Sequence, residues 1–227
     1  MTYITVDSTV KPVGTFDTNF SASEIKNEPM LFNCDLEHAR TLGGPITRTI
    51  LESIPSGWKS CPLVIDSRVH MLMLGWYPCI PGWHHDDVPR TRADGQPNYG
   101  HDADRSEHLI GLLNAHLAPT EFASGRADFA YPTDGTVLYA KWHEDVELLL
   151  VNKFLNLSFA QSGILYQFND RTWHRGVPAV GTGWRFFIRI SRYFDAFSGK
   201  NIARKNVRTN EVRKQVQTYL SAVNAGW

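Results

Sequence analysis

Short apolar runs, each closed by a residue that turns or breaks the chain, recur through the middle of this sequence. Runs rich in aliphatic, β-branched and aromatic residues are typical of strands, and Gly, Pro and Asn mark the turns between them. The clearest run covers residues 184–193, with the sequence WRFFIRISRY. Further strands are predicted over 61–66, 69–76, 108–116, 127–131, 136–142 and 163–168. Many short strands at close spacing favour a mainly β fold, a double-sheet jelly roll with flanking helices.

The two ends of the chain read differently from this middle part. Residues 2–10 alternate weakly and predict a strand, whereas 45–54 has an isoleucine every four residues after Pro45 and predicts a short helix. Residues 144–154 fit either a helix or a strand. Helical spacing returns in the tail, where 200–214 is also basic, as a patch for an anionic partner or simply as a solvated face.

No interdomain linker or internal repeat is visible, so we expect one domain. Its predicted parts are an N-terminal flanking segment over 1–60, a jelly-roll core over about 61–195 and a C-terminal helical segment over 199–227, within the single domain 1–227.

Composition excludes several classes of protein. The 23 basic and 23 acidic residues balance, which gives no support to a dedicated nucleic-acid or membrane-surface binder. Three widely spaced cysteines, Cys34, Cys61 and Cys79, predict free thiols in a reducing compartment rather than a disulfide framework. The sequence has no signal-peptide pattern and no run of 18 apolar residues. We therefore expect a cytoplasmic protein without a membrane span; its oligomeric state is left open.

Two histidines and a carboxylate are candidates for a metal site. His84 and Asp86 lie two residues apart, and His174 follows the apolar run 163–168. Two imidazoles and one carboxylate on one face of an ion, with open positions opposite, form the facial triad of non-haem Fe(II) oxygenases. Because residues two apart in a strand point the same way, the His-x-Asp spacing fits one strand end.

Two alternatives to this triad remain. The run His84-His85-Asp86-Asp87 offers a second ligand pair, His85 with Asp87, on the opposite face of an extended chain. We favour His84 and Asp86 because Trp83 would otherwise occupy the pocket. A second His-x-Asp pair, at 143 and 145, lies only 29 residues before His174, too few for the strands that a jelly roll needs between its ligands. His70, His101, His108 and His116 are interpreted as ordinary core or surface residues.

Two arginines after the second histidine are candidates for binding an oxoacid. Arg185 and Arg189 share a face of the predicted strand, and a guanidinium binds a carboxylate bidentately. One of them could hold the far carboxylate of an oxoacid that chelates the metal. Arg189 forms an Arg-x-Ser motif with Ser191, so either arginine could take this role. Residues 86–106 are polar and rich in Pro and Gly, and we expect this long loop beside the ligands to be a lid.

These residues resemble those of a known superfamily. The run GILYQFNDRTWHRGVPAVGTGWRFFIRIS, with PGWHHDD upstream, is similar to the 2-oxoglutarate- and Fe(II)-dependent oxygenases, in the phytanoyl-CoA hydroxylase-like or prolyl-hydroxylase-like branch. The resemblance covers roughly residues 69–193. It implies a double-stranded β-helix (cupin-like) core with Fe(II), 2-oxoglutarate and dioxygen. It also implies that His84, Asp86 and His174 bind the metal and that Arg185, eleven residues after His174, binds 2-oxoglutarate.

The function expected from this resemblance is hydroxylation of an unactivated C–H bond, with release of succinate and CO2. The carboxylate at Asp86 favours hydroxylation, since halogenating relatives are expected to lack that ligand. We expect a small-molecule substrate in preference to a macromolecule, and the sequence leaves a peptide or nucleobase substrate open. The alternative is a jelly-roll metal-binding or isomerase-type protein without oxygen chemistry, or one whose histidines are incidental.

Overall fold

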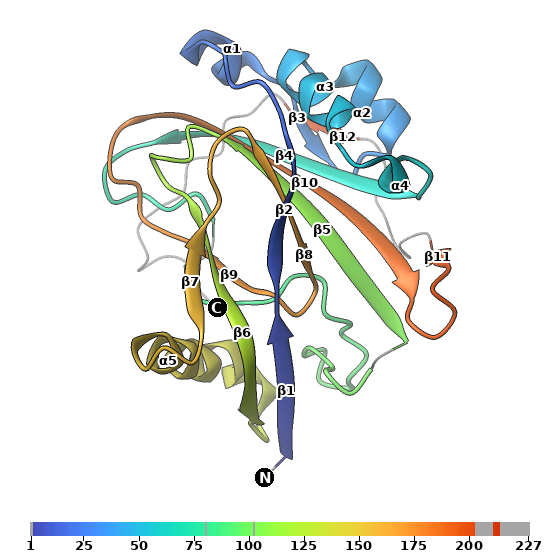
Figure 1. Ribbon diagram of the computed structural model, residues 1–227, viewed down its shortest axis with the longest axis vertical. Helices are drawn as coiled ribbons and strands as arrows, with labels where there is room; N and C mark the ends of the chain where they lie inside the picture. Colours follow the sequence, from blue (N-terminus) through green and yellow to red (C-terminus); the bar gives the residue numbers. More distant parts are fainter. Residues whose placement is uncertain (1, 80, 102, 203–210, 214–227) are drawn as a thin grey trace.

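The protein is described here by a computed structural model, which covers residues 2–79, 81–101, 103–202 and 211–213. It contains a curled pair of β-sheets with helices on two sides (Figure 1). The strands are β1 (Thr2–Ser8), β2 (Val10–Thr15), β3 (Met30–Phe32), β4 (Leu63–Leu72), β5 (Asp104–Leu113), β6 (Thr120–Tyr131), β7 (Asn156–Phe159), β8 (Ile164–Asn169), β9 (Trp173–Gly176), β10 (Gly183–Asp195), β11 (Asn201–Ile202) and β12 (Glu211–Arg213). The helices are α1 (Ala22–Asn27), α2 (Leu36–Leu42), α3 (Pro45–Glu52), α4 (Ser56–Lys59), the 3₁₀ turn η1 (Gly135–Val137) and α5 (Leu138–Val151).

The larger sheet has the order β11-β10-β5-β8-β2. Strand β4 pairs with β10 on the edge opposite β5, next to β11. The smaller sheet contains β1, β6, β7 and β9, and isolated bridges of His84 with His174 and of Pro81 with Gly176 add the segment around His84. Along the chain, β4, β5, β8 and β10 lie in the larger sheet, and the strand segments between them lie in the smaller one. This alternation is that of a double-stranded β-helix, so the predicted fold class is confirmed.

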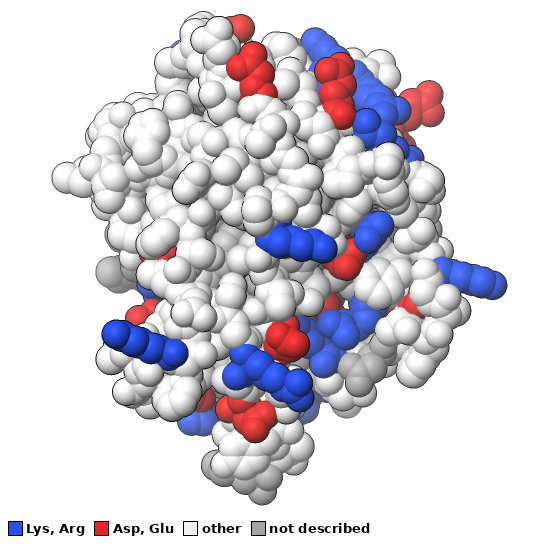
Figure 2. Space-filling model, viewed as in Figure 1, with Lys and Arg blue, Asp and Glu red and all other residues white. Residues whose placement is uncertain are grey.

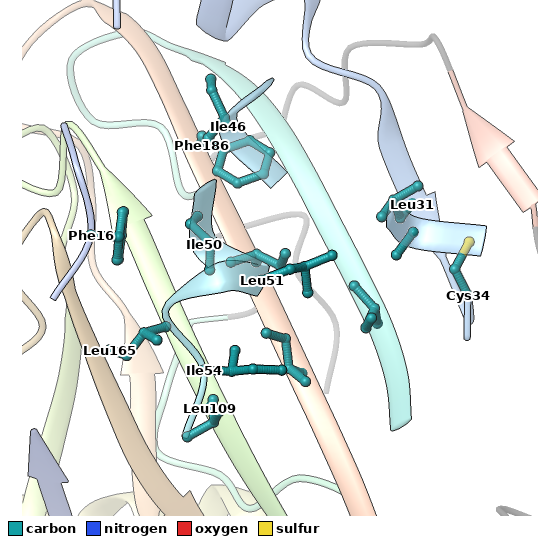
Figure 3. Close-up of a cluster of buried hydrophobic side chains, with 14 of the residues drawn as sticks. Phe16, Leu31, Cys34, Ile46, Ile50, Leu51, Ile54, Leu109, Leu165 and Phe186 are labelled. Carbon is teal, nitrogen blue, oxygen red and sulfur yellow. The ribbon is translucent and has the colours of Figure 1, made fainter. Parts of the chain in front are cut away.

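The outer face of the larger sheet is covered by helices α1 to α4. Along β10, Phe186, Ile188 and Ile190 point toward these helices and belong to the main hydrophobic cluster with Ile46 and Ile50 of α3 (Figure 3). Alternate residues of β10 face the interior of the barrel, because successive strand residues point to opposite sides. This strand therefore separates an apolar layer from the polar groups of the barrel.

The N-terminus of α3 shows how the flanking helices are fixed. Pro45 occupies the first helical position, as predicted. The buried Glu28 carboxylate accepts hydrogen bonds from the backbone N–H groups of Ile46 and Thr47 at 3.3 and 2.8 Å. A carboxylate there satisfies orphan donors and complements the helix dipole.

The outer face of the smaller sheet is covered by α5. Its residues Leu138, Trp142 and Val146 recur every four positions and are buried with Trp83 and Trp173. The strand predicted over 136–142 is therefore wrong. Leu138 and Trp142 suit a strand by composition, but their spacing matches one helix face and α5 buries that face.

Other parts of the fold also differ from the sequence prediction. The strands expected over 61–66 and 69–76 form one continuous strand, β4, and β5 begins at Asp104 instead of 108. The segment 1–60 does more than flank the core, since β1 pairs with β6 and β2 pairs with β8. In the predicted C-terminal helical segment, Asn201–Ile202 form β11 and Glu211–Arg213 form β12, which pairs with β3. Residues 203–210 and 214–227 of that segment lie outside the described residues.

Basic and acidic side chains are mixed on the surface, and the described helices are those of an ordinary domain. On the face in Figure 2, Lys and Arg side chains lie among Asp and Glu side chains. Among the described helices, none has the length and apolar character needed to cross a bilayer.

Candidate functional site

The two candidate histidine ligands face each other across neighbouring segments of the smaller sheet. His84 and His174 form an antiparallel bridge, with backbone N–H to carbonyl oxygen distances of 3.1 and 3.2 Å in the two directions. Directly opposed residues in such a pair point to the same side of a sheet. Their ring centroids are accordingly 4.5 Å apart.

Asp86 completes this group. Its Oδ1 lies 3.9 Å from His84 Nε2, and its Oδ2 lies 3.4 Å from His174 Nε2. One ligand atom from each of the three residues lies within 4.8 Å of the others. The structure thus brings together His84, Asp86 and His174, as the preferred register predicts, and this group could hold a metal ion.

Both histidines are oriented by their second ring nitrogen. His84 Nδ1 lies 2.9 Å from the carbonyl oxygen of Gly82, and His174 Nδ1 lies 2.9 Å from that of Thr172. A carbonyl oxygen can only accept, so Nδ1 carries the proton in each ring. In the neutral imidazole this leaves the Nε2 lone pair directed at Asp86. A second-nitrogen bond to a backbone carbonyl is the usual arrangement of histidines that bind metals.

The charges of the group also suit a cation. Burial, followed by the nearby His174, lowers the pKa of His84 to about 4, so His84 is neutral at pH 7. Burial alone would raise the pKa of Asp86, but Arg189 and His174 together hold it well below its usual range. The site therefore presents an ionised carboxylate and a neutral imidazole, and neither has to lose a proton when a metal binds.

The residues of the alternative register, His85 and Asp87, make other contacts and lie outside the group. His85 is buried, its Nδ1 lies 2.6 Å from the Tyr99 hydroxyl, and its ring centroid lies 3.6 Å from that of Trp173. Asp87 has a φ of 57°, which breaks the strand alternation, and accepts a hydrogen bond from the Tyr193 hydroxyl at 2.9 Å. Trp83 points away from the site, as we expect from the preferred register, and packs beneath α5.

The two arginines have different surroundings. Arg189 donates to Asp86 Oδ2 at 2.5 Å, and its other terminal nitrogen lies 3.5 Å from Asp66 Oδ2. Arg185 is 2% exposed, and its NH1 group lies 3.5 Å from His70 Nδ1. Burial lowers the pKa of Arg185 to about 10. Within the described part of the chain its Nε has no hydrogen-bond partner, and no carboxylate forms an ion pair with this guanidinium.

The sequence analysis did not predict that two buried histidines, His70 and His108, lie beside this site. His108 and His70 are core residues, as expected, but they lie in the barrel interior. His108 Nδ1 lies 2.8 Å from Ser191 Oγ, so the candidate oxoacid ligand Ser191 already has a partner in the protein. Strand alternation could have revealed His108, because it faces Ser191 across β5 and β10.

Other candidate residues lie away from the triad. His143, of the second His-x-Asp pair, is on α5, and its Nδ1 accepts from the Trp83 backbone N–H at 3.2 Å. The expected lid ends at 103, and its Val88 and Tyr99 are buried against α5. This loop therefore contributes two residues to the cluster beneath α5, and its role as a lid stays a prediction.

No family model and no curated protein matches the sequence. Among solved structures, the chain is similar to AviO1 from Streptomyces viridochromogenes, with a TM-score of 0.41 and 13% identity, covering 84% of this chain and 90% of AviO1. It is similar to HygX from Streptomyces hygroscopicus with iron bound, with a TM-score of 0.37 and 13% identity, covering 86% of this chain and 82% of HygX. A structure of EvdO2 from Micromonospora carbonacea var. aurantiaca complexed with 2-oxoglutarate gives a TM-score of 0.36 and 10% identity, covering 66% of this chain.

The chain spans 56% of the length of EvdO2. HygX has also been solved with nickel and 2-oxoglutarate bound. For this chain, both the oxygenase superfamily and the branch within it stay predictions. Because these TM-scores are below 0.5, the similarity carries no weight for the roles of individual residues. Those roles depend on the geometry of the site.

Proposed function

We propose that this protein is a 2-oxoglutarate- and Fe(II)-dependent dioxygenase that hydroxylates an unactivated C–H bond and releases succinate and CO2. The observation that carries the proposal is the convergence of His84 Nε2, His174 Nε2 and the Asp86 carboxylate in one group, in which His174 is buried and the other two residues are half-buried. Each imidazole is fixed with its Nε2 lone pair toward the same point. Two imidazoles and a carboxylate suit Fe(II) and leave the opposite face open.

Bound Fe(II) would supply the chemistry that activates dioxygen with 2-oxoglutarate as the reductant. The residues of this chain would fix the ion, orient the oxoacid and keep water out of the barrel. Asp86 supports hydroxylation over halogenation because a protein carboxylate fills the position that a halide would need.

Arg185 is the residue best suited to hold the far carboxylate of 2-oxoglutarate. A guanidinium buried to 2% exposure is costly without an anionic partner, and the described residues offer it no carboxylate. A bound oxoacid would supply that partner as a bidentate, charge-assisted pair. Arg189 is already engaged by Asp86 and Asp66, which favours a role in holding the metal ligand.

For the substrate we propose a small molecule. The described surface offers no large basic patch on the face in Figure 2 that would suit a nucleic-acid backbone. A peptide or nucleobase substrate would instead be revealed if it increased succinate formation from 2-oxoglutarate and small molecules did not.

The decisive experiment measures 2-oxoglutarate turnover by the purified full chain with Fe(II) in air. We expect succinate to form in step with dioxygen consumption, slowly without a substrate and faster with one. Asp86→Asn should abolish this turnover, whereas Asp145→Asn, in the second His-x-Asp pair on α5, should leave it unchanged. Binding of Fe(II) without any succinate would instead support the metal-binding or isomerase-type alternative.

A further inference from the structure

Helix α5 lies behind the two segments that carry the histidine ligands. Its Trp142 and Val146 pack with Trp83 and Trp173, which precede His84 and His174 respectively. Because neighbouring residues in an extended chain alternate sides, Trp83 and Trp173 face α5 while the two histidines face the barrel. The helix is thus placed to act on the ligands through their neighbours in the chain.

Glu147 of α5 contacts both ligand segments with one carboxylate oxygen. Its Oε1 accepts a hydrogen bond from Trp83 Nε1 at 2.7 Å and another from the Arg175 guanidinium. Trp83 immediately precedes His84, and Arg175 immediately follows His174. The Arg175 guanidinium also lies 4.3 Å from the Trp83 ring centroid and donates to Glu121 of β6 at 2.6 Å.

This contact adds side-chain bonds to the backbone links between the two ligand segments. The backbone joins the segments at two isolated bridges, His84 with His174 and Pro81 with Gly176, although the two histidines are 90 positions apart in sequence. The bonds to Glu147 are charge-assisted, and such bonds are stronger than those between neutral groups. They also pin Trp83 and Arg175, which sets the direction in which the adjacent histidines leave the sheet.

We propose that Glu147 is a positioning residue for the metal site, which holds His84 and His174 at their ligand spacing from the outer face of the sheet. The proposal rests on the proposed function only in that these histidines bind a metal. Glu147 touches neither the ion nor a substrate, and it acts through Trp83 and Arg175. Substitution of a residue that is bonded directly to a metal ligand commonly lowers metal affinity ten- to a hundredfold. Glu147 is bonded to the neighbours of the ligands, so we expect an effect at the lower end of this range.

The test compares Ni(II) affinity in full-length variants, with Ni(II) as a redox-inert probe. We expect Glu147→Ala to weaken Ni(II) binding about tenfold, and Glu147→Gln about threefold, since the amide oxygen still accepts from Trp83 but no longer pairs with Arg175. Glu144→Ala removes an exposed carboxylate from the same helix and should leave the affinity unchanged. Leu149→Ala should lower the melting temperature by loosening the packing of α5 without altering Ni(II) affinity.

Hydrogen exchange of the metal-free proteins gives an independent measurement. The amides of His84 and His174 should exchange faster in Glu147→Gln than in Leu149→Ala, even where Leu149→Ala is the less stable variant. Equal Ni(II) affinity in wild type and both Glu147 variants would overturn the positioning role while leaving the metal site intact. A wild-type protein that binds no Ni(II) would overturn the metal site itself and the proposed role of Glu147 with it.

Discussion

Replacing Arg185 by methionine should stabilise the ligand-free protein while weakening 2-oxoglutarate binding. Methionine keeps an unbranched, flexible side chain and removes the charge. Burial lowers the pKa of Arg185 from its ordinary value to about 10. At 1.36 kcal/mol per pH unit, this difference corresponds to roughly 3 kcal/mol. Since the folded-state pKa is the lower one, the buried charge destabilises the folded protein by that amount at all pH values below about 10.

Part of this cost is offset by the contacts of Arg185 with His70 and the Phe187 ring. We therefore expect Arg185→Met to raise the free energy of unfolding by about 1–3 kcal/mol. The apparent KM for 2-oxoglutarate should rise roughly ten- to a hundredfold, because a lost charge-assisted partner costs about 1.5–3 kcal/mol.

The assay combines urea unfolding of the metal-free protein with 2-oxoglutarate titration of turnover. Arg189→Met is the matched control, because Arg189 lies in the same strand, four residues further on and on the same face. It leaves Asp86 and Asp66 without their cation, so the half-buried pairs should cost the protein about 1–3 kcal/mol of stability. An Arg185→Met protein that is less stable than wild type and keeps its KM would refute the reasoning.

Four further outcomes are expected. Asp86→Asn should lose Fe(II) affinity while Asp87→Asn keeps it, as measured by metal titration; the reverse order would contradict the register. His174→Ala should abolish succinate formation with little change in the far-UV circular dichroism, and unchanged turnover would rule out its role as a ligand. Residues 88–106 should gain hydrogen-exchange protection when substrate binds, and equal protection would count against a lid. Because burial lowers the pKa of His108 to about 4, the unfolded chain binds its proton first, so stability should fall as pH drops from about 6.5 to 4. His108→Gln should make this slope less steep in urea unfolding at several pH values, while His84, which also has its pKa lowered to about 4, keeps part of it.

The grouping of His84, Asp86 and His174 could be predicted because its signal is local. His84 and Asp86 lie two apart, and His174 is the second residue of a short strand that ends at Gly176, so strand alternation puts each on a definite face. The bulk of Trp83 was enough to choose between the two registers. The jelly roll followed from short apolar runs, since their spacing leaves room for little else.

Other features depended on contacts that no local pattern encodes. The residues 136–142 have strand-like composition, and the burial of the helix face that carries Trp142 against Trp173 selects the helix. The partners of Arg189 and Arg185 could not be assigned, because Asp66 and His70 reach them from β4, more than a hundred residues earlier. Glu147 gave no signal, since a glutamate on a helix is ordinarily solvated.

The two faces of β10 place unequal limits on how this chain can vary in length. Phe186 and Ile188 face the helices while Arg185 and Arg189 face the barrel, so removing one residue within the strand would bury guanidinium groups in the apolar layer. In the preceding turn, Ala179 is buried and hydrogen-bonded to Trp76, whereas Val180 at the tip is 71% exposed. Insertions and deletions that homologous chains tolerate should therefore collect at 180–182 and stop at Gly183, where the alternation begins.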